Sequence, residues 1–372
     1  MSGVDGANDA AALQLLAALG EIPTAPLHEL KVAAYVAGYL QAIGVPFQVD
    51  PYGNVIATLG QSQSVPPVAF AAHLDHPAFE ISAVGSGRTA RALLLGGVSV
   101  DCFHRPVPVL VYPNAHPVNA TIIGAERDVP VSGSVTLILE VEDVVQVGDY
   151  GVFDLPPFQQ EGETVSMRAA DDLAGVAAAL AALKELARSP VPGQVFGVFT
   201  RAEEVGLVGA ALVAQQRILP PRTIVISLEC SRELPGAQPG LGPVIRVGDR
   251  TRSFDPVGEA LLLAARDRLA DTPVQRQLMS GGTCEATAYA FAGYAATGVA
   301  LPLVNYHNVG PDDSIAQEQI NARDYLGEIK ILVAAAHAAG VAVEPSSKAR
   351  IAARVDQYQA RLRASAPDFQ QL

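Results

Sequence analysis

The spacing of apolar residues divides the chain into stretches of different texture. Residues 9–44 carry apolar side chains at helical spacing, which predicts two helices separated at Pro23 and Pro26. Later, apolar runs of strand length alternate with helical stretches, which indicates a mostly parallel sheet covered by helices on both faces. The expected strands are 47–49, 55–59, 68–72, 195–199, 223–228 and 297–301, and the expected later helices are 173–187, 205–216, 258–269 and 322–339.

A different pattern fills the middle of the chain. Between Phe79 and Glu163, short β-branched runs alternate with Gly, Pro and Asn, without a helical stretch of ordinary length. This pattern predicts a small β-barrel or sandwich inserted into an α/β domain. We therefore expect a catalytic domain made of residues 1–77 and 165–345, an inserted β-rich domain at 78–164, and a charged, partly helical tail at 346–372.

Composition narrows the class of protein. Of 372 residues, 49% are hydrophobic and 17% charged, which allows a large core and is the opposite of a disordered composition. The net charge is −13 and no Lys/Arg cluster occurs, so a nucleic acid partner is not expected. Three scattered cysteines do not form a thiolate zinc pattern. We find neither a signal-peptide pattern nor a membrane span, and expect a soluble, cytoplasmic protein.

Polar residues follow the predicted strands at several points. His73 and Asp75 end one strand, and residues two apart in an extended segment point the same way. Such a pair can be a metal ligand with its orienting carboxylate, or a core histidine bonded to a nearby acid. Asp171 and Asp172 precede a helix, where acids are also ordinary caps.

Further acids and a histidine occupy similar positions. Glu203 and Glu204 follow another strand, and adjacent carboxylates repel unless a cation is present, although a solvated acidic turn is the alternative. Glu229 ends one apolar strand and His307 follows another, and each alone could be a surface or cap residue. Two imidazoles and three carboxylates at one sheet edge suit two zinc-like ions that share a bridging carboxylate; the set is His73, Asp171, Glu204, Glu229 and His307.

These residues lie in segments that resemble a known enzyme family. The chain is similar, over about residues 13–343, to the dinuclear metallo-aminopeptidases of the glutamyl/leucyl aminopeptidase type, which include tetrahedral aminopeptidases and endoglucanase-M-like proteins. The resemblance implies a zinc-exopeptidase-like α/β fold with a mixed sheet and an inserted barrel. The matching segments are 49–54, 72–75, 147–149, 153–154, 167–172, 203–210, 281–283 and 301–307.

The resemblance also implies a role for each candidate residue. Asp171 would bridge two divalent ions, zinc or cobalt, with His73 and Glu229 at one ion. Glu204 and His307 would complete the second site. Glu203 would be the general base, and Asp75 would orient His73. The implied activity is removal of N-terminal residues from peptides.

The sequence departs from the family pattern near these segments. Leu173 replaces an arginine, Cys284 an aspartate, and Val304-Asn305 an Arg-Tyr pair, while Glu229 stands for a more frequent aspartate. His76 is a further departure, which could be an additional site residue or a loop residue, and we favour the loop residue. The departures leave open a carboxypeptidase or N-acyl amino acid deacylase, or a scaffold without turnover. Mean hydropathy of +0.25 and the β insertion favour a homo-oligomer.

Overall fold

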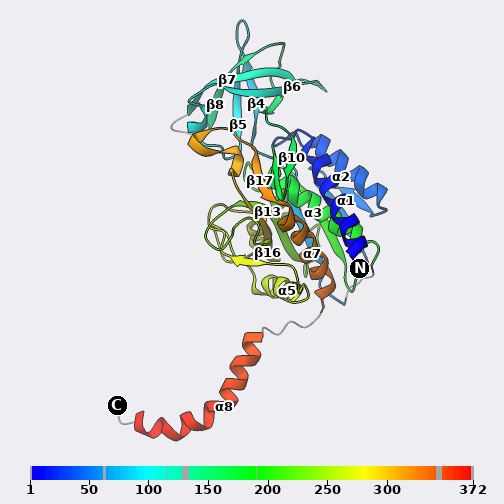
Figure 1. Cartoon of the computed structure of the whole chain (residues 1–372), viewed down its shortest axis with the longest axis vertical. Helices are drawn as coiled ribbons and strands as arrows, with labels where there is room; N and C mark the ends of the chain where they lie inside the picture. Colours follow the sequence, from blue (N-terminus) through cyan, green and yellow to red (C-terminus); the bar gives the residue numbers. More distant parts are fainter. Residues whose placement is uncertain are drawn as a thin grey trace. The chain divides into compact units, whose positions relative to one another are not determined.

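The computed structural model describes residues 2–61, 64–114, 116–127, 134–189, 191–340 and 346–369. Contacts divide the chain into one unit at 1–339 and a second at 340–372. The larger unit combines an eight-stranded mixed sheet, a closed six-stranded barrel and a small three-stranded sheet. Figure 1 shows the barrel strands grouped apart from the main-sheet strands β13 and β16.

The main sheet has the order β1-β2-β12-β3-β13-β16-β14-β15. Its four central strands run parallel, and antiparallel pairs occur toward both edges. The mixed, mostly parallel sheet predicted from the sequence is therefore confirmed. The strands are β1 (Phe47–Val49), β2 (Val55–Leu59), β3 (Val68–His73), β12 (Val195–Thr200), β13 (Ile224–Arg232), β14 (Val244–Arg246), β15 (Gln275–Gln277) and β16 (Ala295–Leu303).

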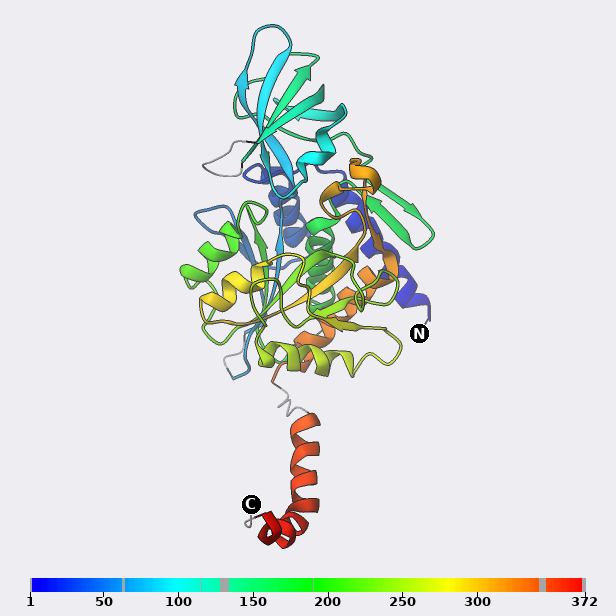
Figure 2. The same ribbon diagram turned by 90° about the vertical axis from the view of Figure 1, so that its left-hand side faces the viewer.

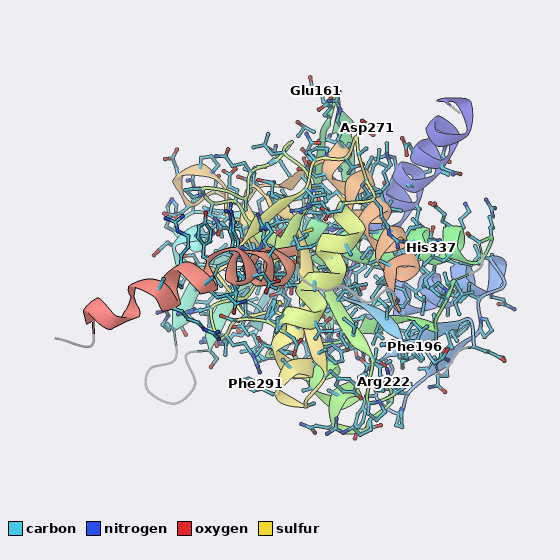
Figure 3. All side chains as sticks on the ribbon, turned by 90° about the horizontal axis from the view of Figure 1, so that it is seen from below. Glu161, Phe196, Arg222, Asp271, Phe291 and His337 are labelled. Carbon is cyan, nitrogen blue, oxygen red and sulfur yellow. The ribbon has the colours of Figure 1, made fainter. Side chains whose placement is uncertain are left out.

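Helices cover both faces of this sheet. Alternate residues of β3 enter two different cores: Phe70 and Ala72 face one, whereas Ala69 and Ala71 face the other. The larger core receives α1 (Ser2–Gly20), α2 (Leu30–Ala42), α3 (Ala170–Leu186), α5 (Pro256–Arg266) and α7 (Ala322–Ala338). The smaller core receives α4 (Val208–Gln215) and α6 (Glu285–Phe291). Phe291 at the end of α6, labelled in Figure 3, remains 71% exposed. The Arg252 guanidinium lies 5.2 Å from its ring centroid.

The insertion forms a closed barrel with the strand order β4-β5-β8-β7-β6-β9. Inward-facing side chains such as Ile81, Ile122 and Leu139 give it a core of its own. The predicted β-barrel is thus observed, while the expected domain limits remain a prediction. Its strands are β4 (Ala78–Val84), β5 (Thr89–Leu95), β6 (Val107–Tyr112), β7 (Val118–Arg127), β8 (Val135–Val141) and β9 (Tyr150–Phe153).

A third, smaller sheet carries β10 (Phe158–Glu161), β11 (Thr164–Met167) and β17 (Glu318–Asn321). The hairpin of β10 and β11 lies beside α1 (Figure 2). Met167 of β11 is opposite Glu318 of β17, and β11 leads directly into α3. This sheet therefore joins the chain around residue 170 to the chain around residue 318.

The final helix, α8 (Ser346–Phe369), belongs to the second unit. It agrees with the partly helical tail expected from the sequence. Among the described residues, no helix combines the length and the apolar character needed to cross a bilayer.

Candidate active site

The carboxyl ends of the central parallel strands deliver the first candidate ligands. His73 is the last residue of β3 and pairs in register with Thr200, the last residue of β12. On the other side of β3, Ser227 of β13 is opposite Ala71, so Glu229 lies level with His73 along the sheet. Open α/β sheets bind ligands at such ends.

Asp171 lies between the two histidines. It occupies the first turn of α3 with non-helical angles (φ −82°, ψ 107°), which turns its carboxylate toward the sheet edge. Its Oδ1 is 3.3 Å from His73 Nε2, and its Oδ2 is 3.6 Å from His307 Nε2. His307 Nε2 is also 3.5 Å from Glu204 Oε1. Each oxygen of Asp171 therefore faces a different imidazole.

These separations fit ligands of a metal ion better than hydrogen bonds. Two donors about 2.0–2.2 Å from a tetrahedral ion lie about 3.3–3.6 Å apart, whereas N–H···O bonds are typically about 2.7–3.2 Å long. Three overlapping groups have donor atoms within 4.8 Å of one another: His73 with Asp171 and Glu229, His73 with Glu203 and Glu204, and Asp171 with Glu204 and His307. Asp171 Oδ1 and Glu229 Oε1 are buried and have no hydrogen-bond partner in the part of the chain that the structure describes. The donor set fits a divalent cation.

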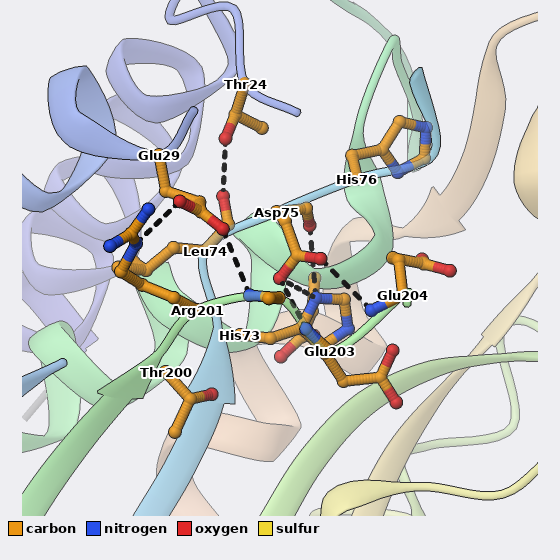
Figure 4. Close-up of polar contacts among 12 residues, drawn as sticks. Thr24, Glu29, His73, Leu74, Asp75, His76, Thr200, Arg201, Glu203 and Glu204 are labelled. Carbon is orange, nitrogen blue, oxygen red and sulfur yellow. Dashed lines mark hydrogen bonds and ion pairs between the residues drawn. The ribbon is translucent and has the colours of Figure 1, made fainter. Parts of the chain in front are cut away.

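The turn that carries Glu203 and Glu204 is held by Asp75. The backbone amides of Glu203 and Glu204 donate to Asp75 Oδ1 and Oδ2 respectively, each over 3.0 Å (Figure 4). Asp75 also approaches His73: its carbonyl oxygen is 3.0 Å from His73 Nδ1, and its carboxylate is 3.6 Å away. Asp75 thus orients His73 mainly through its backbone, while its carboxylate clamps the glutamate turn.

This turn also changes where the following helix begins. The sequence predicts a helix from 205, but residues 203–207 form a tight turn in which the amides of Gly206 and Leu207 both donate to the Glu203 carbonyl. Helix α4 therefore starts only at Val208. Gly209 packs against the turn so closely that a Cβ there would lie 2.3 Å from the Arg201 carbonyl oxygen.

A second buried carboxylate joins the other two ligand-bearing segments. Glu318 accepts the backbone amide of Asp171 at Oε2 over 2.9 Å and that of His307 at Oε1 over 2.8 Å. His307 adopts the left-handed region (φ 57°), and its Nδ1 lies 3.0 Å from the Gly97 carbonyl of the insertion. Sequence reasoning missed Glu318, because nothing near it in the chain marks it as a site residue.

His76 also differs from its interpretation as a loop residue. It is buried, and its ring nitrogens face the Asp171 carbonyl oxygen and Asn308 Oδ1. Asn308 in turn donates to the Arg168 and Ala316 carbonyls. His76 therefore supports the backbone beneath Asp171. Its place directly after His73-Leu74-Asp75 was the signal that could have revealed this.

A third set of contacts anchors the strand that precedes the glutamate turn. Glu29 is fully buried and pairs with Arg201 Nε over 2.6 Å, while its other oxygen accepts the Ala202 amide over 3.0 Å. Thr24 donates to the Leu74 carbonyl over 2.7 Å, as Figure 4 shows. The site therefore rests on buried polar contacts from the α1–α2 connection.

Crowding of acids in this buried site alters their ionisation. Burial raises the pKa of Glu203 and of Glu204 well above their usual range, and neighbouring carboxylates add to the effect. Burial, reinforced by Asp171, raises the pKa of Glu229 to about 8. Burial also raises the pKa of Asp171, but His73 and His307 outweigh it and lower that pKa overall. A divalent cation would relieve this repulsion among acids.

The two histidines respond in opposite directions. Burial opposes the charge on His73, yet Glu203, Asp171 and Asp75 together raise its pKa well above the ordinary value. Burial lowers the pKa of His307 to about 4, so its imidazole is neutral at pH 7. A neutral imidazole is the form that binds a metal.

A pocket of about 230 Å³ opens beside Glu229. Arg246, which is 2% exposed, lines it; its Nη1 donates to Ser231 Oγ over 3.0 Å, and its Nε has no partner among the described residues. Arg232 also lines the pocket, 5.4 Å from the ring centroid of Tyr306. The remaining lining residues include Met279, Gly281, Gly282 and Thr283.

The residues at which the sequence departs from the family pattern lie in different parts of the structure. Leu173 is fully buried in the larger core. Cys284 is buried at the start of α6, where its amide donates to Asp249 Oδ2 over 3.1 Å. Asn305 takes the left-handed region (φ 57°) and donates to the Gln317 carbonyl. Glu285, next to Cys284, is buried and accepts a hydrogen bond from Thr200.

The fold and the site together define an α/β peptide hydrolase of the exopeptidase type with an inserted β-barrel. Comparison with known families agrees: the model of the M42 glutamyl aminopeptidases matches residues 134–318. The resemblance to this family that the sequence motifs indicated is therefore confirmed. The family is metal-dependent, and the described residues contain clusters of side chains that could hold a metal ion.

Individual relatives are similar to most of the chain, and the solved structures among them share its fold. A protein of Acetivibrio thermocellus, provisionally named an aminopeptidase, is 27% identical over 311 residues, which cover 77% of this chain and 87% of that protein. The Pyrococcus horikoshii TET1 peptidase, which can assemble into a tetrahedron or a large octahedral shell, has a TM-score of 0.75 at 22% identity, covering 87% of this chain and 99% of its own. An aminopeptidase from Desulfurococcus kamchatkensis has a TM-score of 0.73 at 24% identity, covering 90% and 99%.

Proposed function

We propose that this protein is a two-metal aminopeptidase of the M42 family that removes N-terminal residues from peptides. The observation that carries the proposal is the position of Asp171, whose two carboxylate oxygens face His73 and His307 at 3.3 and 3.6 Å. His73 and Glu229 would hold one divalent ion, zinc or cobalt, and Glu204 and His307 the other. Bound ions of this kind acidify a water and polarise a carbonyl group.

Glu203 is the group that would move the proton. Its buried carboxylate, with a pKa raised well above the usual range, can hold a proton near neutral pH. One carboxylate oxygen takes the proton from the attacking water and then delivers it to the leaving amine nitrogen. Asp75, through the amides of Glu203 and Glu204, keeps that carboxylate in place.

The pocket beside Glu229 supports a preference for acidic N-terminal residues. A buried guanidinium with an unpartnered N–H is costly unless an anion meets it, and Arg246 Nε has no partner among the residues that the structure describes. A glutamate or aspartate side chain entering the pocket of about 230 Å³ would supply the missing acceptor. Arg232 adds a second positive charge to the same pocket.

The decisive experiment follows a peptide with a free N-terminal glutamate and its N-acetylated twin by mass spectrometry. We expect stepwise loss from the free N-terminus only, abolished by a chelator and restored by zinc or cobalt. Glu203→Gln should lower kcat by about 10²–10⁴ while leaving the metal content, measured by elemental analysis, unchanged. Loss from the C-terminus, or of the acetyl group alone, would establish a carboxypeptidase or deacylase instead.

We expect peptides as substrates, a cytoplasmic location, and a homo-oligomer. The assembly of the Pyrococcus horikoshii TET1 peptidase into closed shells supports the last of these.

A further inference from the structure

Helix α8, in the second unit of the chain, carries a narrow apolar stripe. Ile351, Val355, Tyr358 and Leu362 recur at intervals of four, three and four residues, which places them within about 60° of one another around the helix. They are 65%, 54%, 38% and 69% exposed. Since most helical stability in proteins comes from packing an amphipathic face, this stripe indicates a surface that a partner covers.

Arginines follow one edge of the stripe. Arg350, Arg354 and Arg361 all lie on the same flank at helical spacing, and the Arg354 guanidinium is 6.0 Å from the ring centroid of Tyr358. Residues 346–372 contain five basic and two acidic residues, whereas residues 1–345 contain 20 and 36. The helix segment therefore has a net charge of +3 and the preceding chain −16, so the partner surface is expected to be acidic.

The loop after β8 offers a surface with the matching properties. Val144 and Val147 are 75% and 66% exposed there, between the acidic residues Glu142, Asp143 and Asp149. The loop has a defined shape, because the Val144 amide donates to Asp143 Oδ1 over 2.7 Å and the Gln146 amide to Asp149 Oδ2 over 2.6 Å. Exposed apolar side chains rimmed by charges are typical of protein interaction sites.

We propose that α8 of one copy of the chain docks on the loop 142–149 of a second copy. The apolar stripe would cover Val144 and Val147, while the arginine flank would face the loop's acids. Pairing of two α8 helices fits less well: an antiparallel pair would bring the arginine flanks together, and the described stripe spans fewer than the three heptads that a coiled coil usually needs. A stripe of about 60° is also narrower than the apolar face of a helix that lies on a membrane.

The test uses full-length chains and does not involve the peptidase reaction. Self-association is measured by sedimentation velocity for the wild type, Arg354→Glu, Glu142→Arg, and the matched control Arg363→Glu, whose position lies away from the arginine flank. We expect at least a fivefold weaker association for Arg354→Glu and Glu142→Arg, and less than a twofold change for Arg363→Glu. Raising the salt concentration should weaken the wild-type association as well.

Mixing the two weakened variants identifies the occupant. In the mixture, the α8 helix of the Arg354→Glu chain can meet the loop of the Glu142→Arg chain with the two charges exchanged, so association should return to within twofold of the wild type. Three results would overturn the proposal: equal effects of Arg354→Glu and Arg363→Glu, failure of the mixture to recover, or association unchanged by Arg354→Glu while that variant loses binding to phosphatidylserine vesicles. None of these results bears on the proposed hydrolysis, which is tested separately by peptide cleavage.

Discussion

Replacing Asp75 by asparagine tests whether its carboxylate positions the turn of Glu203 and Glu204 or only stabilises the fold. The change keeps the shape of the side chain and one acceptor oxygen, but presents an NH₂ group to one of the two backbone amides that now donate over 3.0 Å. Asp75 is fully buried, so water does not replace the lost acceptor. A charge-assisted hydrogen bond contributes about 1.5–3 kcal/mol net.

This magnitude translates into a measurable loss of catalysis. If the free energy of this hydrogen bond is lost in full from the positioning of Glu203 and Glu204, kcat/KM should fall by about 10- to 150-fold, since each 1.36 kcal/mol is one power of ten. The assay is the initial rate of N-terminal hydrolysis of a chromogenic amide at saturating metal, together with urea unfolding of the same samples. We expect the free energy of unfolding to fall by a similar amount, about 1.5–3 kcal/mol.

Asp324 provides the matched control. Its two oxygens also accept two backbone amides, those of Gly242 and Gly240, each over 2.7 Å, and it is 1% exposed at the start of α7. Asp324→Asn should therefore destabilise the protein by a similar amount while leaving kcat/KM within twofold of the wild type. If Asp75→Asn behaves in the same way as Asp324→Asn, the carboxylate of Asp75 stabilises the fold without positioning the glutamates.

Three further predictions rest on single residues. Burial raises the pKa of Glu285 from 4.5 to about 7, so the folded state holds its proton more tightly than the unfolded state and loses stability as the pH rises from about 4.5 to 7. Glu285→Gln should therefore raise the free energy of unfolding by up to about 3 kcal/mol at pH 8 and by little at pH 4.5; an equal effect at both pH values would contradict this. Arg246→Met should lower kcat/KM at least tenfold for a peptide with an N-terminal glutamate and less than threefold for one with an N-terminal leucine. Equal losses of kcat/KM for both peptides would contradict the proposed preference for acidic residues. Gly209→Ala should cost about 1–3 kcal/mol through overpacking and lower activity as well, because the added Cβ would lie 2.3 Å from the Arg201 carbonyl; an active variant of unchanged thermal stability would show that the turn can relax.

Most main-sheet strands could be predicted from the sequence because each is a compact apolar run with little ambiguity. The short strands β14, β15 and β17 were not predicted, since three or four residues such as Gln275–Gln277 carry no periodic signal. The first barrel strand, β4, has a similarly weak pattern: it alternates only at its start and then exposes Ser82, Ala83 and Val84. Short or partly exposed strands are defined by their partners more than by their own residues.

The candidate site shows the same limit. His73 and Asp171 could be proposed from the sequence because one ends a strand and the other begins a helix. Glu229 was expected to end its strand, but β13 continues to Arg232 because Cys230, Ser231 and Arg232 still pair with β16. Glu318 could not be proposed, because it acts on a backbone amide 147 residues away. The contact of His307 with the insertion was equally hidden, since the Gly97 carbonyl has no side-chain signature.

The contact between His307 and Gly97, and the distance in sequence between His73 and His307, determine when the site can form during synthesis. His73 leaves the ribosome 234 residues before His307, which at about 5–20 residues per second is a delay of roughly 10–50 s. In between, the whole barrel is made, and it can close on its own core because all its strands lie between residues 78 and 153. The nascent chain can therefore hold a closed barrel, but it has only part of its proposed ligand set until His307 emerges and meets Gly97. Proteolytic activity would then be withheld from the polypeptide until nearly all of it has been translated.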